Sequence, residues 1–244
     1  MSESARRGTA RTAVVWDALQ EALDAPGAFY EERARIVDIG GGTGGFAVRL
    51  AQLGHTVTVV DPSPDALAAL ARRAAESDVL DRVTGLQGDV DGLLDVVEEA
   101  DVVLCHGVLE VVDDPAAALA TIHQVLRPGG VLSLLVAQRH AAVLARAMAG
   151  HFQQALGLLD HSTLATGGRS GSRFTHDEAA DLLAGAGFTV DSVRGVRVFA
   201  DLVPGSLLDL EPGATAALVE LERAVSTRPE YLPLATQIHL LSHR

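Results

Sequence analysis

Short runs rich in β-branched residues alternate with helical segments through the first half of the chain. The expected strands cover residues 35–40, 55–61, 83–90, 101–108 and 131–137. The helices expected between them cover residues 45–54, 63–77 and 114–126. Strands and helices that alternate with short links are typical of a parallel sheet covered on both faces. The sequence therefore predicts an α/β fold with a doubly wound, mostly parallel seven-stranded sheet.

The alternation breaks after residue 137. Beyond it we expect, in order, a helix, a loop, a helix, a strand, a helix and a strand, over residues 141–160, 162–172, 175–188, 189–201, 213–227 and 235–244. No repeat and no linker separates two domains. We therefore expect one domain over residues 1–244, with an N-terminal helix at about 5–25 and an inserted segment at about 138–174 that caps the active site.

Composition limits the partners and the compartment. The 244 residues carry a formal net charge of −13, which argues against non-specific binding of nucleic acid over a large surface. All 19 basic residues are arginines, so the sequence offers no lysine base. Residues 137–176 hold four arginines against one aspartate, so they are either an anion-docking segment or a solvated insertion. With one cysteine, no long apolar run and no secretory signal, we expect a cytoplasmic protein without a membrane span.

A glycine-rich loop follows the first expected strand, in the stretch VDIGGGTGGF. Gly40, Gly42 and Gly45 match the dinucleotide fingerprint, and Asp61 lies where an acid that holds a ribose is expected. An NAD-dependent oxidoreductase is therefore one hypothesis, and a simple tight turn is another. Asp38 favours a different cofactor, because a carboxylate beside the loop would repel a pyrophosphate. It would attract the ammonium and sulfonium groups of S-adenosyl-L-methionine.

The order of the motifs VDIGGGTG, VVDPSPDALAAL, GDVDGL and VLRPGGVLSLL resembles class I S-adenosylmethionine-dependent methyltransferases, which have a Rossmann-like fold. The resemblance implies that the glycine loop lies against the methionine part of the cofactor and that Asp61 holds the ribose hydroxyls. It also implies that the residues after the third strand cover the adenine. Those residues are Asp89, Val90 and Asp91. As an alternative to contacting the adenine, Asp89 and Asp91 could each cap a helix or lie as a charge on the surface.

Other stretches are similar to the bacterial tRNA 5-carboxymethoxyuridine methyltransferases, from about Arg11 to the C-terminus. They are CHGVLEVVDDP, LRPGGVLSLLVAQRHAAVLARAMAGHF, GVRVFAD and YLPLATQIHLLSHR. The resemblance implies esterification of a carboxylate on the wobble uridine of tRNA. It implies that Arg11 binds the cofactor's carboxylate and that Gly40 and Gly41, with Gly42 of the same loop, contact the methionine moiety. It also implies that His106 makes a further contact with the cofactor.

The sequence identifies the methyl acceptor less clearly than it identifies the cofactor. A carboxylate is ionised at neutral pH, so its methylation needs no general base, and we assign no catalytic residue. Arg197 is our candidate for holding the acceptor's anion, with Arg139 and His140 lining the pocket; a surface position is the alternative for all three. The arginine-poor segment after residue 152 keeps a small-molecule O- or N-methyltransferase as an alternative. A non-catalytic binding module is a further one, and no residue spacing predicts a metal site.

Overall fold

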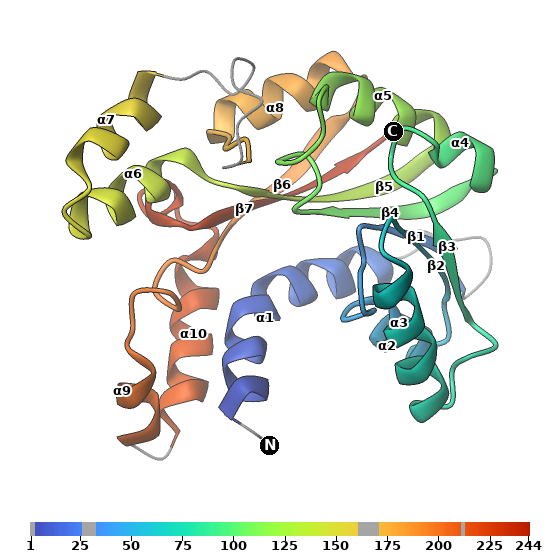
Figure 1. Ribbon diagram of the computed structural model, residues 1–244, viewed down its shortest axis with the longest axis horizontal. Helices are drawn as coiled ribbons and strands as arrows, with labels where there is room; N and C mark the ends of the chain where they lie inside the picture. The colour runs from blue at the N-terminus through green and yellow to red at the C-terminus, as the bar shows by residue number, and fades with distance from the viewer. Residues whose placement is uncertain (1–2, 26–32, 161–170, 211–212) are drawn as a thin grey trace. The chain divides into compact units, whose positions relative to one another are not determined.

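The computed structural model describes residues 3–25, 33–160, 171–210 and 213–244 (Figure 1). The chain forms two compact units. Unit 1 comprises Met1–Glu21, Leu135–Ala179 and Ser192–Leu240. Unit 2 comprises Ala22–Leu134, Ala180–Asp191 and Leu241–Arg244. The chain passes between them within strands and helices, so that β5, for example, begins in unit 2 and ends in unit 1.

The seven strands form one sheet. They are β1 (Arg35–Ile39), β2 (Thr56–Asp61), β3 (Val83–Gln87), β4 (Ala100–His106), β5 (Leu126–Ala137), β6 (Thr189–Val196) and β7 (Gln237–His243). Their order in the sheet is β3-β2-β1-β4-β5-β7-β6. The pairs β1–β2, β1–β4 and β2–β3 are parallel. Because β1 neighbours both β2 and β4, the winding reverses there, which confirms the predicted doubly wound sheet.

The helices of unit 2 are α2 (Ala47–Gln52), α3 (Pro64–Glu76), α4 (Leu93–Val96) and α5 (Pro115–Val125). Two of them, α3 and α5, begin where the sequence signals placed them. The Ser63 hydroxyl accepts from the N–H of Ala66 at 3.3 Å, and the Asp114 carboxylate caps α5 at 3.0 Å. Helix α3 lies beside β2 and β3 and covers them (Figure 1). The short α4 was not expected from the sequence.

The segment RPGG does not turn the chain, as the sequence suggested, but belongs to β5. Helix α5 ends at Val125 and the strand begins at once with Leu126. The backbone of Gly129 and Gly130 pairs with Arg244 through hydrogen bonds of 3.1 and 3.0 Å. The glycines are therefore held as strand by the end of the chain, a partner more than 100 residues away that no local signal reveals.

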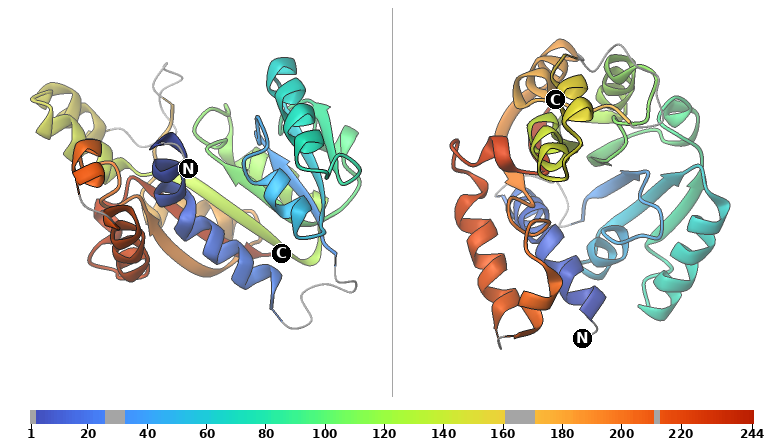
Figure 2. Two further views of the ribbon diagram at one scale, coloured as in Figure 1. Left: turned by 90° about the horizontal axis from the view of Figure 1, so that it is seen from below. Right: turned by 60° about the vertical axis from the view of Figure 1, so that its left-hand side comes forward.

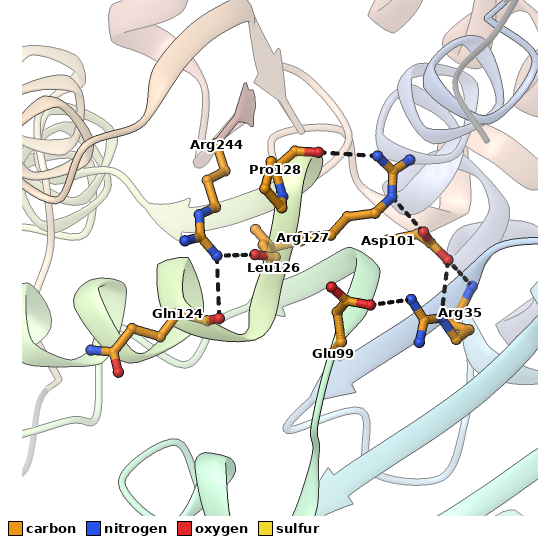
Figure 3. A network of polar contacts seen from close by, with 8 residues as sticks. All are labelled: Arg35, Glu99, Asp101, Gln124, Leu126, Arg127, Pro128 and Arg244. Atoms are coloured by element: carbon orange, nitrogen blue, oxygen red, sulfur yellow. Dashed lines mark hydrogen bonds and ion pairs between the residues drawn. The ribbon is translucent and has the colours of Figure 1, made fainter. Parts of the chain in front are cut away.

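An ion-pair network joins the starts of β1, β4 and β5 in unit 2 (Figure 3). Asp101 accepts from the Arg127 guanidinium at 2.6 Å and from the backbone N–H of Arg35 at 2.7 Å. Glu99 binds the Arg35 side chain at 2.7 Å, and Arg244 donates to the carbonyl of Leu126. The network lies at the amino ends of the strands. Ligands of doubly wound sheets bind at the carboxyl ends, so we assign this network to stability.

Unit 1 is mainly helical. Its helices are α1 (Glu3–Leu23), α6 (Arg139–Met148), α7 (Phe152–Asp160), α9 (Gly205–Leu210), α10 (Ala214–Ser226) and the 3-10 turn η1 (Leu232–Leu234). Neither α9 nor η1 was expected from the sequence. Helices α1 and α10 lie side by side (Figures 1 and 2), where Ala13 packs with Leu218 and Val219. The helix expected over residues 141–160 is two helices, because Gly150 has a left-handed φ of 77°.

Helix α8 (His176–Gly185) begins with the capping box expected from the sequence. The Glu178 carboxylate accepts from the N–H of Thr175 at 2.9 Å, and the Thr175 hydroxyl accepts from the N–H of Glu178 at 3.2 Å. The loop expected over residues 162–172 lies largely outside the described residues. Among the residues the structure does describe, none forms a helix long and apolar enough to cross a membrane.

Candidate active site

The glycine loop after β1 is built on backbone conformations that only glycine adopts readily. Gly40, Gly42 and Gly44 have φ values of 66°, 56° and 78°. A Cβ on Gly41 would lie 2.4 Å from Oδ2 of Asp38, and one on Gly44 would lie 2.2 Å from Cδ1 of Leu70. The glycines that the loop requires are therefore 40, 41, 42 and 44. Gly45, the last glycine of the dinucleotide fingerprint, has open space around it.

Asp38 is a buried carboxylate directly beneath this loop. Its exposure is 3%, and burial together with the nearby Asp61 charge raises its pKa to about 7. A group that titrates at neutral pH is poised to be ionised by a cation that binds close to it. The Asp38 environment therefore fits a cationic ligand and opposes an anionic one.

Asp61, at the end of β2, fixes the shape of the same loop. Its Oδ2 accepts from the N–H of Gly42 and its Oδ1 from the N–H of Ser63, both at 2.9 Å. The residue is 7% exposed and lines a cavity. Each carboxylate oxygen has a second lone pair, so Asp61 can still accept hydrogen bonds from hydroxyl groups of a ligand.

A cavity of about 350 Å³ opens at the carboxyl ends of β1, β2 and β4 in unit 2. Six of the predicted cofactor residues line it: Gly40, Asp61, Asp89, Val90, Asp91 and His106. Oδ1 of Asp89 also caps its own turn by accepting from the N–H groups of Asp91 and Gly92 at 3.1 and 3.2 Å. Asp89 therefore has the local capping role that the sequence left open, whereas Asp91 is exposed at the cavity.

His106, the last residue of β4, is held in place on two sides. Its Nε2 lies 2.8 Å from the Ser133 hydroxyl, and its ring meets Phe46 edge to face at 5.0 Å between centroids. Burial lowers the pKa of the imidazole to about 4. The ring is therefore neutral at pH 7 and, with such a pKa, is a poor general base there.

A second cavity, of about 430 Å³, lies within unit 1. Its polar lining residues are Gln138, Arg146, Arg173, Arg197, Asp201, Thr236 and Gln237. The structure places Arg197 at this cavity, and its role in holding the acceptor's anion stays a prediction. Arg139 and His140 do not line it.

Arg139 is bound instead to Glu178, with Nη2 at 2.8 and 2.7 Å from the two carboxylate oxygens. His140 is exposed on α6. Arg11 belongs to α1, but its side chain lies outside the described part of the chain, so its predicted cofactor contact stays a prediction. The described residues contain no cluster of His, Cys, Asp and Glu able to hold a metal ion.

Comparison with known proteins decides between the cofactor hypotheses. A family model described as a methyltransferase domain matches residues 37–132, the span from β1 to β5 that includes the glycine loop and the first cavity. This span is a methyltransferase domain. Its cofactor is S-adenosyl-L-methionine rather than a dinucleotide, which agrees with the buried Asp38 beneath the loop.

Relatives and solved structures agree with this assignment. A tRNA 5-carboxymethoxyuridine methyltransferase of Escherichia coli (strain K12) is 29% identical, over 98% of this chain and 89% of the relative. A ubiquinone biosynthesis O-methyltransferase of Xanthomonas euvesicatoria is 33% identical over 48% of each chain. An S-adenosylmethionine-dependent methyltransferase from Mesorhizobium loti has the same fold, with a TM-score of 0.61 and 23% identity, covering 96% of this chain and 100% of that one.

Sequence reasoning missed several residues of the second cavity. Gln138, Asp201 and Gln237 line it, and none was singled out. The spacing of Arg197 and Asp201 in RVFAD was no signal, because charges four residues apart pair regularly only on a helix and this segment was expected to be a strand. Tertiary packing brings Gln138 and Gln237 to the cavity, and no pattern in the sequence predicts that they lie there.

Proposed function

We propose that this methyltransferase esterifies the carboxylate of 5-carboxymethoxyuridine in tRNA. The similarity to the E. coli enzyme carries the proposal, because it extends over 98% of this chain and 89% of that enzyme. It therefore includes unit 1, with the second cavity, as well as the segment common to methyltransferases in general.

The first cavity and the glycine loop beside it are our proposed cofactor site. Gly40, Gly41 and Gly42 let the backbone approach the methionine moiety closely, and Asp38 balances its positive charge from below. Asp61 would accept from the ribose hydroxyls. Val90 would pack against the adenine, and Asp91 would accept a hydrogen bond from it, since its carboxylate, unlike that of Asp89, caps no turn among the described contacts. His106 completes the wall as a neutral ring.

A carboxylate acceptor suits the chemistry available in the described residues. When bound, S-adenosylmethionine supplies an electrophilic methyl group, whose bond to sulfur breaks as an acceptor oxygen attacks. The carboxylate is already ionised at pH 7, so no proton must be removed. His106 would serve poorly as a base because its pKa is about 4. The protein's task is then to orient the carboxylate and exclude water.

Arg197 is our proposed holder of the acceptor's anion. Arg139 has a positioning role instead, because its guanidinium ties the start of α6 to Glu178 in the capping box of α8. His140 and Arg11 keep their proposed substrate and cofactor contacts. We also retain the proposal that residues 138–174, which include α6 and α7, cap the active site.

The test uses purified protein, S-adenosylmethionine labelled in the methyl group, and two tRNA pools that differ in whether they contain 5-carboxymethoxyuridine. We expect label only in the pool with the modified uridine, and we expect mild base to release it, because methyl esters hydrolyse readily. Label that resists base, or equal labelling of both pools, would refute the proposal.

A small-molecule O-methyltransferase is the second candidate, supported by the net charge of −13 and by the ubiquinone-pathway relatives. Transfer of label to small molecules of a cell extract, with none on either tRNA pool, would favour it. In that case the cofactor assignment stands and only the acceptor changes.

A further inference from the structure

Arg197 has a backbone conformation that an L-residue rarely adopts. Its φ is 61°, and apart from it only Asp78 among the described non-glycine residues has a positive φ. The Arg197 carbonyl accepts from the N–H of Thr236 at 3.3 Å and from the Thr236 hydroxyl at 3.0 Å. Such strain persists only where the surroundings fix it, and it concentrates at functional sites.

Glu222 fixes the next three residues. It projects from α10, is fully buried, and accepts from the N–H groups of Val198, Phe199 and Ala200 at 2.9, 2.8 and 2.7 Å. A buried carboxylate bound to three consecutive N–H groups holds the backbone rigidly. The backbone from Arg197 to Ala200 is therefore held both by Thr236, just before β7, and by Glu222 in α10.

At the cavity, the Arg197 guanidinium is paired with the Asp201 carboxylate four residues later. The pair is neither buried nor fully solvated, with side-chain exposures of 25% and 21%. Two further polar atoms in the cavity wall, Nε of Arg197 and Oε1 of Gln138, are buried without a hydrogen-bond partner among the described residues. Gln138 is itself 2% exposed. The Gln138 Oε1 and the Arg197 Nε–H are therefore an acceptor and a donor that a polar ligand of this cavity could use.

We propose that Asp201 is a placeholder: in the acceptor-free protein its carboxylate occupies the position on Arg197 that the acceptor's carboxylate takes during the reaction. The ligand class is a small carboxylate substituent such as a carboxymethoxy group. The identity of the acceptor rests on the proposed function, whereas the exchange of one carboxylate for another on Arg197 does not.

Exchange of one carboxylate for another keeps Arg197 paired throughout, so the guanidinium is never left without an anion. The methyl ester formed in the reaction is neutral and competes poorly for Arg197. Asp201 then returns to its place and favours release of the product. The placeholder thus distinguishes the ionised acceptor from the neutral product, although it weakens binding of the acceptor.

The experiment titrates methoxyacetate, the carboxymethoxy fragment alone, into the full-length protein. The Nε–Hε resonance of Arg197 is followed by NMR and assigned with the Arg197→Gln variant. Methyl methoxyacetate is the neutral probe. Asp201→Asn removes the placeholder. Asp17→Asn is the matched control, because it removes a carboxylate of similar exposure (27%) from a different arginine pair in the same unit.

We expect methoxyacetate to shift the Arg197 resonance and to bind Asp201→Asn about fivefold more tightly than the wild type, the size of one exposed ion pair. The neutral ester should cause no shift, and Asp17→Asn should match the wild type. Equal or weaker binding by Asp201→Asn would overturn the proposal. If the exchange is observed but tRNA is not methylated, the placeholder stands and the tRNA acceptor fails.

Discussion

The buried Asp38 carboxylate should make the acceptor-free protein less stable at high pH. Its pKa is about 7 in the folded protein against 3.8 for the ordinary side chain, because burial and Asp61 oppose the charge. The folded state therefore binds more protons than the unfolded state between these values. The stability due to protonated Asp38 is fully present below pH 3.8 and is lost as the pH rises through 7. A shift of about 3 units corresponds to about 4 kcal/mol at most.

Asp38→Asn replaces the carboxylate with a neutral group of the same shape. At pH 8 we expect the variant to exceed the wild type in free energy of unfolding by up to about 4 kcal/mol, against about 1.6 kcal/mol at pH 5, where Asp38 is ionised only in the unfolded wild type. For a chain of 244 residues this corresponds to a rise in Tm of about 2–4 °C per kcal/mol. Thermal unfolding followed by circular dichroism at both pH values measures it.

The same substitution should abolish the attraction for a cationic ligand. In calorimetry with S-adenosylhomocysteine, which keeps the ammonium group, wild-type affinity should rise with pH until Asp38 is ionised, near pH 7. The variant's affinity should be low and independent of pH over this range. Asp101→Asn is the control, because its carboxylate is paired with Arg127 and its loss should destabilise the fold at both pH values. If Asp38→Asn is no more stable than the wild type at pH 8, the argument from burial is wrong.

Three further predictions follow from single contacts. Gly44→Ala should disrupt the loop and weaken S-adenosylhomocysteine binding at least tenfold in calorimetry, because its Cβ would lie 2.2 Å from Leu70. Gly45→Ala is the control and should bind like the wild type, because the space around Gly45 is open. Equal losses of affinity in both variants would contradict the loop geometry. The imidazole resonances of His106 should stay those of the neutral ring from pH 8 to 5.5 in NMR, since burial lowers its pKa to about 4; a midpoint near 6.5 would disprove this. Arg127→Gln should lower the free energy of unfolding in urea by about 1.5–3 kcal/mol, because it removes a charge-assisted hydrogen bond and leaves Asp101 with Arg35 alone. A loss below about 0.5 kcal/mol would show that the network is dispensable.

Local patterns in the sequence determined most of unit 2. The spacing of β-branched runs and the caps at Ser63 and Asp114 predicted its strands and helices, because hydrogen bonds within three residues decide where a helix begins. The parallel order of the strands placed the glycine loop and Asp61 at the carboxyl edge of the sheet, where one cavity now contains them. The class of cofactor could therefore be predicted from the sequence alone.

The tertiary structure decided what distant residues do to one another. It showed that Gly44 rather than Gly45 is required, since the reason is contact with Leu70 in α3. It also showed that Glu222 holds the segment after Arg197 from a helix 24 residues further along. The periodicity of a sequence relates only residues that are near one another along the chain. The burial, the pKa and the ion pairs of a side chain depend on distant residues that packing brings together. For this reason the class of cofactor could be predicted from the sequence, and only the tertiary structure decided how Arg197 and Asp201 share a cavity.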